Sequence, residues 1–158
     1  MKVFTVKKEK EETLDEKTFG VVSSLNFKGR DNFNYIIIEN PSDSRKIYII
    51  KNLDVMIREC NNELSLMQGE TDKMNKISKM NGYKKLADLN LFDGIEKNNN
   101  NEEIELVKNI INQNKRYNIL NDSALIMLPG GCLSIKLKKE VSDLDININW
   151  TSDDIYNS

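Results

Sequence analysis

Apolar and polar residues alternate with a period of two in two parts of this chain, one near each end. Side chains on a β-strand point alternately to opposite faces of the sheet, so such a run predicts a strand with one buried face. In the N-terminal part, the pattern predicts strands at 21–28, 33–40 and 46–51, with turns at 28–31 and 40–44 between them. We therefore expect a three-strand meander.

The C-terminal part predicts three more strands. Ala124 to Leu128 is a continuous apolar run, and Leu133 to Leu137 alternates after the turn residues Pro129-Gly130-Gly131. Together these segments predict a β-hairpin. Leu144 to Trp150 alternates again and predicts a sixth strand, followed by an acidic tail at 151–158.

Between these parts the apolar spacing changes to that of a helix. Residues three and four apart share one face of a helix, and this spacing predicts an amphipathic helix that ends at Gly69. The apolar residues with this spacing are Leu53, Met56, Ile57, Cys60, Leu64 and Met67. Further helical segments are predicted at 71–80, 83–89 and 102–117, and the Asn-rich segment 97–101 is predicted to be a flexible loop. We therefore expect a helical insertion over residues 53–117.

The chain has 158 residues, which is the size of one domain, and we expect 1–158 to form a single domain. A three-strand meander, a helical insertion and a C-terminal hairpin follow the element order of the OB-fold, a Greek-key barrel that binds oligonucleotides. The predicted fold class is α+β, with an OB-like antiparallel β-barrel.

Residues 19–55 also resemble the cold-shock domain. That family reads approximately G-x-V-x-W-F-N, G-F-G-F-I and V-F-V-H-x-S-x-I. The corresponding segments here are Gly20-Val21-Val22-Ser23-Ser24-Leu25-Asn26, Asn32-Phe33-Asn34-Tyr35-Ile36 and Ile47-Tyr48-Ile49-Ile50-Lys51-Asn52-Leu53-Asp54-Val55. The family's tryptophan, histidine and central glycine are replaced by Ser24, Ile50 and Asn34. The resemblance implies that Phe33, Tyr35 and Tyr48 are stacking aromatics.

The period of two gives the same three aromatics an outer face without reference to any family. If the alternate isoleucines of each strand face a core, then Phe33, Tyr35 and Tyr48 face outward. The cations beside this face are Lys28, Arg30, Arg45 and Lys46. Flat rings with cations at the rim are what single-stranded nucleic acid requires for stacking and phosphate contact. The alternative is that the predicted helices cover this face and the rings belong to the core.

The chain contains no histidine, the commonest general base and a common zinc ligand, and no other catalytic constellation replaces it. We therefore expect a protein that is not an enzyme and that needs no cofactor or metal. A net charge of −2 excludes a protein that coats duplex DNA by charge alone. The leading hypothesis is binding of single-stranded DNA or RNA by the aromatic and basic face.

A second hypothesis, from another class, is a small protein-binding inhibitor, immunity or anti-defence protein. The acidic balance favours it, and the abundance of Asn, Lys and Ile suggests an AT-rich genome such as that of a phage, plasmid or virus. A protein partner would bind the helical insertion or the acidic tail, with Asp153, Asp154, Ile155 and Tyr156 as the tail's contact residues.

No apolar run approaches the roughly 18 residues that a membrane-spanning helix needs, and the N-terminus lacks a signal-peptide core. We therefore expect a cytoplasmic protein with no membrane partner. Cys60 and Cys132 are not spaced like metal ligands and are expected to be core thiols.

Overall fold

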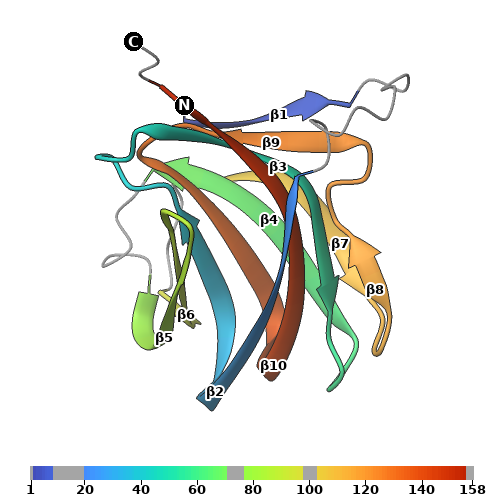
Figure 1. Cartoon of the computed structure of the whole chain (residues 1–158). Coiled ribbons are helices and arrows are strands. Elements are labelled where there is room, and N and C mark those ends of the chain that lie inside the picture. The colour runs from blue at the N-terminus through green and yellow to red at the C-terminus, as the bar shows by residue number, and fades with distance from the viewer. Residues whose placement is uncertain (1, 9–19, 71–76, 98–102, 156–158) are drawn as a thin grey trace.

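The structure, a computed structural model, describes residues 2–8, 20–70, 77–97 and 103–155 (Figure 1). Within these ranges all the regular secondary structure is β-strand, and there is no helix. The strands are β1 (Val3–Lys7), β2 (Val21–Glu39), β3 (Lys46–Met56), β4 (Asn62–Glu70), β5 (Ile77–Leu86), β6 (Leu89–Glu96), β7 (Ile104–Ile111), β8 (Arg116–Asn118), β9 (Ser123–Met127) and β10 (Gly131–Asp154). They join one antiparallel sheet in the order β1-β9-β3-β10-β2-β6-β5, while β4 pairs with β10 and β7, and β8 pairs with β3.

The predicted α+β class and the OB-like barrel are therefore wrong. The described residues contain no helix, and the path from β1 to β5 does not close. The same finding shows that none of the described residues is in a helix long and apolar enough to cross a membrane.

The helical insertion at 53–117 is wrong because the helical spacing joins residues of two different strands. Leu53, Val55 and Ile57 are all buried, which is the period of two expected for β3. In β4, Leu64 and Leu66 are buried and continue the same alternation, whereas Met67 is only half-buried. The helical reading paired Leu64 with Met67 and passed over Val55 and Leu66.

The remaining predicted helices are also strands where the structure describes them. Residues 77–86 form β5, which turns directly into β6, and residues 104–111 form β7 beside β4. Residues 71–76 and 98–102, which include most of the Asn-rich loop prediction, lie outside the described residues.

The three-strand meander is wrong in its connectivity, although all its predicted strand segments are strands. The first two segments form one long strand, β2, with no turn at 28–31. There, residues 29–32 of β2 lie opposite Ser142 alone, between the pairs Lys28–Asp143 and Phe33–Val141. This bulge bends the strand where the sequence predicts a turn. The third segment, β3, pairs with β10 and not with β2.

The C-terminal hairpin is wrong in the same way. β9 pairs with β1 and β3, so β3 separates it from β10 in the sheet. The predicted fifth and sixth strands are instead one strand, β10, which bends near residues 138–142 (Figure 1). Its first half pairs with β4 and its second half with β3, while β2 lies along both halves. β10 is therefore the strand that holds the other elements together.

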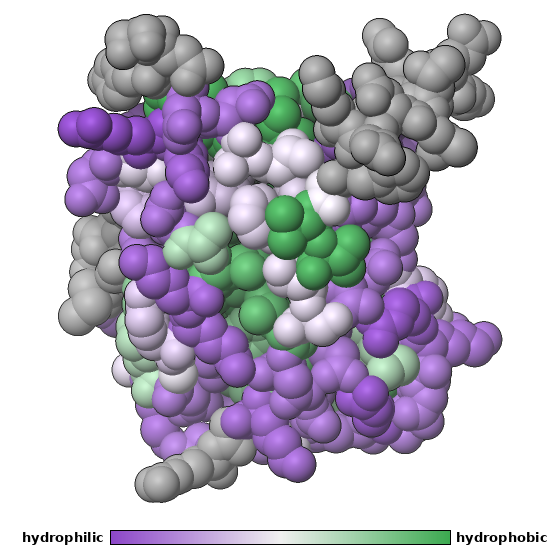
Figure 2. Space-filling model, in the orientation of Figure 1, coloured by the Kyte–Doolittle hydropathy of each residue, from purple (hydrophilic) through white to green (hydrophobic). Residues whose placement is uncertain are grey.

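The sheet is buried on both faces over part of β2, which produces two cores. The larger core lies inside the curved sheet and contains residues from nearly every strand, among them Phe33, Ile36 and Ile38. The smaller core lies on the other side and contains Tyr35, Ile37, Ile77, Phe92 and Cys132. Burial on both faces explains why Ile36-Ile37-Ile38 is a continuous apolar run. The outer surface in Figure 2 is mostly hydrophilic, with a small hydrophobic patch over β2 and β10.

Candidate functional site

The three predicted stacking aromatics have no exposed surface. Phe33, Tyr35 and Tyr48 are each 0% exposed. Tyr48 and Ile50 face the main core while Ile47 and Ile49 are half-buried, so the face of β3 was assigned in reverse. Phe33 and Tyr35 enter different cores because the pairing of β2 with β10 shifts register between them. The structure therefore brings the three rings into the interior and not onto one outer face.

The predicted basic residues are separated. Lys28 is exposed near the bulge of β2, and Arg45 and Lys46 lie at the start of β3, where Lys46 pairs with Asp88 at 3.5 Å. Arg45 and Lys46 line a second cleft, of about 480 Å³, together with Asp154. The side chain of Arg30 lies outside the described residues.

The predicted acidic tail begins inside the sheet. Asp153 and Asp154 belong to β10 and pair with Ile47 and Lys46 of β3. The backbone N–H of Ile155 donates a 2.8 Å hydrogen bond to the carbonyl of Arg45. Both aspartates and Ile155 are exposed at the side chain, and Tyr156 lies outside the described residues.

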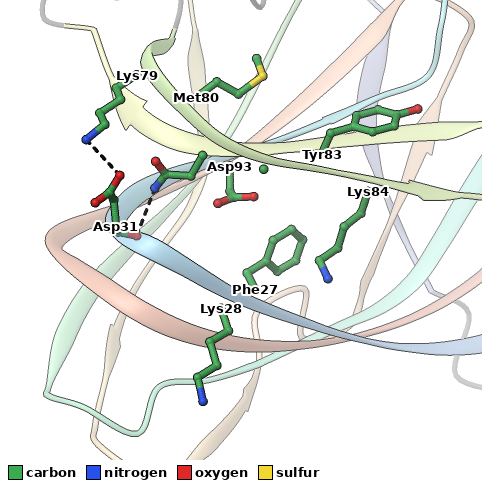
Figure 3. Close-up of a pocket in the computed structure, with 10 residues that line it drawn as sticks. Phe27, Lys28, Asp31, Lys79, Met80, Tyr83, Lys84 and Asp93 are labelled. Carbon is green, nitrogen blue, oxygen red and sulfur yellow. Dashed lines mark hydrogen bonds and ion pairs between the residues drawn. The ribbon is translucent and has the colours of Figure 1, made fainter.

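A cleft of about 380 Å³ lies between the first half of β2 and the β5–β6 hairpin (Figure 3). Among the described residues, β2 pairs with β6 from Tyr35 to Glu39 and its first half pairs with β10 and not with the hairpin, so space remains between the two. The residues that line it are Phe27, Lys28, Asp31, Lys79, Met80, Asn81, Gly82, Tyr83, Lys84 and Asp93. Three lysines and two aspartates make this a polar site.

Side-chain contacts hold the two walls of the cleft at one end. Lys79 of β5 pairs with Asp31 of β2 at 3.1 Å, and the amide of Asn81 donates to the carbonyls of Asp31 and Asn32 at 3.1 Å each. Farther along, Lys84 Nζ lies 5.6 Å from the centroid of the Phe27 ring. The two walls are therefore joined by an ion pair and hydrogen bonds near Asp31 and by a cation–π contact near Phe27.

Asp93 of β6 is the buried acid of this cleft. It is 5% exposed, and Figure 3 shows its carboxylate between the two walls, above the Phe27 ring. Burial raises the pKa of Asp93, while the nearby charge of Lys84 and its own backbone N–H act in the opposite direction. Among the described residues no ion pair includes Asp93.

A second group of buried polar side chains covers the smaller core. Glu103 accepts hydrogen bonds from the hydroxyls of Tyr35 and Ser134, the latter at 2.8 Å, and pairs with Lys136 at 2.9 Å. Lys136 also pairs with Glu96 at 2.6 Å. Burial opposes the ionisation of Glu103, but the hydrogen bonds from Tyr35, Lys136 and Ser134 outweigh it and lower the pKa of Glu103. Burial, reinforced by Glu103, raises the pKa of Tyr35, which therefore remains the proton donor.

The contacts of this second group link Glu103, the residue before β7, to Tyr35 of β2 and to Ser134 and Lys136 of β10, so the group attaches that residue to the sheet. The cleft differs, because it contains both open space and a buried acid without an ion pair. It is the candidate functional site. In the described part of the chain, no three acidic or cysteine side chains come together to hold a metal ion.

Of the residues predicted from the sequence, only Lys28 lines this cleft. Lys79, Lys84 and Asp93 lie in the segment predicted to be helical, where strand alternation was not considered. A usable signal was present in β6, because Asp93 follows Leu89 and Leu91 at the same period of two. A carboxylate in the buried phase of a strand is unusual and marks a position worth examining.

No protein-family model matches this chain, and no curated protein matches it either.

Proposed function

We propose that this protein binds single-stranded nucleic acid, without catalysis, in the cleft between β2 and the β5–β6 hairpin. The observation that carries the proposal is the gathering of three lysines, Lys28, Lys79 and Lys84, around an open cleft in a chain of net charge −2. Its volume of about 380 Å³ is within the range of small-ligand sites and suits one nucleotide unit.

The charges of the cleft favour binding of single-stranded nucleic acid over binding of a free cation. Within the described residues Lys28 and Lys84 form no ion pair, so both are available to phosphate groups. Phosphate contacts supply affinity that depends on the few cations in contact and not on the total charge. Tyr83, on the outer side of β5, is 54% exposed and offers a ring to a neighbouring base.

This proposal uses different residues from those of the cold-shock resemblance. Phe33, Tyr35 and Tyr48 are core residues, so they do not contribute to it. Lys28 belongs to both the predicted site and the cleft, and Tyr83 takes the stacking role that was predicted for the buried rings. DNA and RNA are both candidate ligands, and the proposal places the protein in the cytoplasm.

Fluorescence anisotropy with labelled oligonucleotides of mixed sequence tests the proposal. We expect binding at low salt that weakens at least tenfold in the double variant Lys28→Gln, Lys84→Gln. The matched control is Arg45→Gln, which removes an exposed cation from the other cleft and should leave affinity within about twofold. Absence of binding at low salt, or an equal loss in the control after correction for the number of charges removed, would contradict the proposal.

A second candidate function is protein binding, as an inhibitor, immunity or anti-defence protein, through the outer edge of β7. Among the described strands β7 pairs with β4 alone, and its apolar residues Ile104 and Ile110 are 53% and 73% exposed. An open strand edge with exposed apolar side chains is a template for another chain to add a strand. A nuclease-resistant partner captured from the source cell and lost in Ile110→Lys would favour this function. Its retention in that variant would exclude the β7 edge.

A further inference from the structure

The Asp93 carboxylate is an acceptor that forms no ion pair with the described residues. The residue is 5% exposed, and its side chain lies in the cleft (Figure 3). A buried carboxylate is costly unless hydrogen-bond donors or cations compensate it. The described interactions are those with its own backbone N–H and the more distant charge of Lys84. The cleft thus holds acceptor capacity that a ligand can use.

The backbone of β5 is arranged to leave room for this carboxylate. A Cβ atom at Gly82 would lie only 2.6 Å from Oδ1 of Asp93, so a larger residue there would displace the acid. The register of β5 and β6 shifts between Met80 and Gly82, and this shift sets Gly82 opposite Asp93. The absence of a side chain at Gly82 allows the acid to lie against β5 inside the cleft.

The charged side chains around Asp93 limit which chemical group can bind beside its carboxylate. A free cation would match Asp93 but would be repelled by Lys28, Lys79 and Lys84, which line the same cleft. A nucleotide suits both the carboxylate and the lysines, because its base carries N–H donors for Asp93 and its phosphate carries a negative charge for the lysines. A carboxylate has two acceptor oxygens side by side, so it fits best a base edge with two adjacent donors.

Guanine is the common base with that edge, since its N1–H and its 2-amino group point in the same direction. Thymine and uracil offer a single N–H between two carbonyl oxygens, which a carboxylate repels. Adenine and cytosine offer an amino group beside a ring acceptor. Proteins that read single strands commonly bond the Watson–Crick edges of unstacked bases.

We propose that Asp93 accepts paired hydrogen bonds from the Watson–Crick edge of a guanine, so that the cleft selects guanine within a single strand. This inference rests on the proposed function and adds a base preference to it. Lys28 and Lys84 then contact the flanking phosphates, and Gly82 preserves the position of the acid.

The preference is tested by anisotropy with four labelled 12-residue oligonucleotides. One contains thymidine only, and the others carry a single central guanine, hypoxanthine or adenine. We expect the guanine strand to bind about tenfold more tightly than the thymidine strand, which corresponds to about 1.4 kcal/mol for the bidentate pair. Hypoxanthine retains N1–H but lacks the 2-amino group, so its strand should bind with intermediate affinity.

The nearly isosteric variant Asp93→Asn tests the residue. It should lose the preference for guanine, so that the guanine and thymidine strands bind the variant with affinities within about twofold of each other, and a thermal melt of the variant checks that it folds. Equal binding of guanine and thymidine strands by the unmodified protein would overturn the inference and leave the proposed function standing. A guanine preference that survives in Asp93→Asn would overturn the role of Asp93. Absence of binding to all four strands would overturn both.

Discussion

Glu103 has a side chain with no exposed surface and is nevertheless held in its charged form. Hydrogen bonds from Tyr35, Lys136 and Ser134 outweigh the effect of burial, so the folded pKa lies below the value of about 4.3 for a free glutamate. Because the folded pKa is lowered, the stabilisation is fully present above the unfolded value. It is lost as the pH falls through the folded value.

We predict that Glu103→Gln lowers the free energy of unfolding by about 1–3 kcal/mol at pH 7, because Lys136 and the two hydroxyls lose a charged acceptor. Urea denaturation measures the change, and the difference from the unmodified protein should shrink as the pH is lowered toward 3. Glu105→Gln is the control, since Glu105 is exposed two residues away and bonds only Ser65 among the described hydrogen bonds. A similar loss in both variants would mean that the buried network adds nothing specific.

Tyr48 illustrates why a loss of binding must be separated from a loss of folding. Its ring packs 5.6 Å from that of Trp150, and its hydroxyl accepts a 3.0 Å hydrogen bond from the backbone N–H of Asp88. We predict that Tyr48→Ala destabilises the fold by about 3–5 kcal/mol, as for other large aromatic residues removed from a core. Tyr48→Phe should cost only about 1 kcal/mol, because it removes one hydrogen bond and keeps the ring.

Trp150 fluorescence during urea denaturation measures both variants. If Tyr48 were instead a stacking residue on an exposed face, Tyr48→Ala would leave stability unchanged and reduce oligonucleotide binding. That pair of results would contradict the buried position of Tyr48.

At the scale of single elements, the β5–β6 hairpin positions both Asp93 and the lysine-bearing wall of the cleft. Gly94 lies opposite Met80 in this hairpin, between two register shifts. A Cβ at Gly94 would overlap the carbonyl oxygen of Lys79 and lie 2.8 Å from Cγ2 of Ile77. Neither neighbour can move without disturbing the hairpin or the smaller core, because one is backbone and the other is a buried side chain.

We predict that Gly94→Ala costs about 1–3 kcal/mol by overpacking and loosens β5 from β6. Hydrogen exchange should show faster exchange of the β5 and β6 amides, with β3 and β9 protected as before. Oligonucleotide binding should also weaken in Gly94→Ala, since β5 supplies Lys79 and Lys84. Unchanged protection in β5 would show that the hairpin tolerates the methyl group.

Strand segments were predictable from the sequence where one face of a strand is buried and the other is exposed to solvent. Leu144 to Trp150 alternates strictly, and the structure has it as part of β10. Alternation does not reveal pairing partners, so the separation of β9 from β10 by β3 could not be foreseen. It also fails at bulges, where an added residue changes the spacing. In β7, the register with β4 shifts near Leu66, and the spacing of Ile104, Val107 and Ile110 imitates a helix.

The candidate site was hidden for a related reason. Lys28 was found because it lies on the predicted outer face of the first strand. Asp93 and Lys84 come together only through the hairpin of β5 and β6 and the bend of β2, which are tertiary features. Their approach depends on the incomplete pairing of β2 with β6, and no spacing within the sequence encodes that gap.

At the scale of the whole molecule, positive charge is local although the net charge is −2. The cleft carries three lysines and two aspartates, while other lysines are paired with carboxylates, such as Lys108 with Glu63 at 2.7 Å. A nucleic-acid strand bound along this cleft therefore contacts few lysine side chains that are not already paired with carboxylates. Its binding should depend on salt only weakly compared with that of proteins that neutralise many phosphates.

We predict a slope of about −1.4 for the logarithm of the binding constant against the logarithm of salt concentration, since Lys28 and Lys84 each contact one phosphate and each such contact on a single strand contributes about −0.7. The double variant Lys28→Gln, Lys84→Gln should bring the slope close to zero, because the remaining lysine of the cleft, Lys79, is paired with Asp31, whereas Arg45→Gln should leave it unchanged. Anisotropy titrations at four salt concentrations measure all three slopes. A slope steeper than about −4 in the unmodified protein, or one that the double variant does not alter, would place the strand on another face of the molecule.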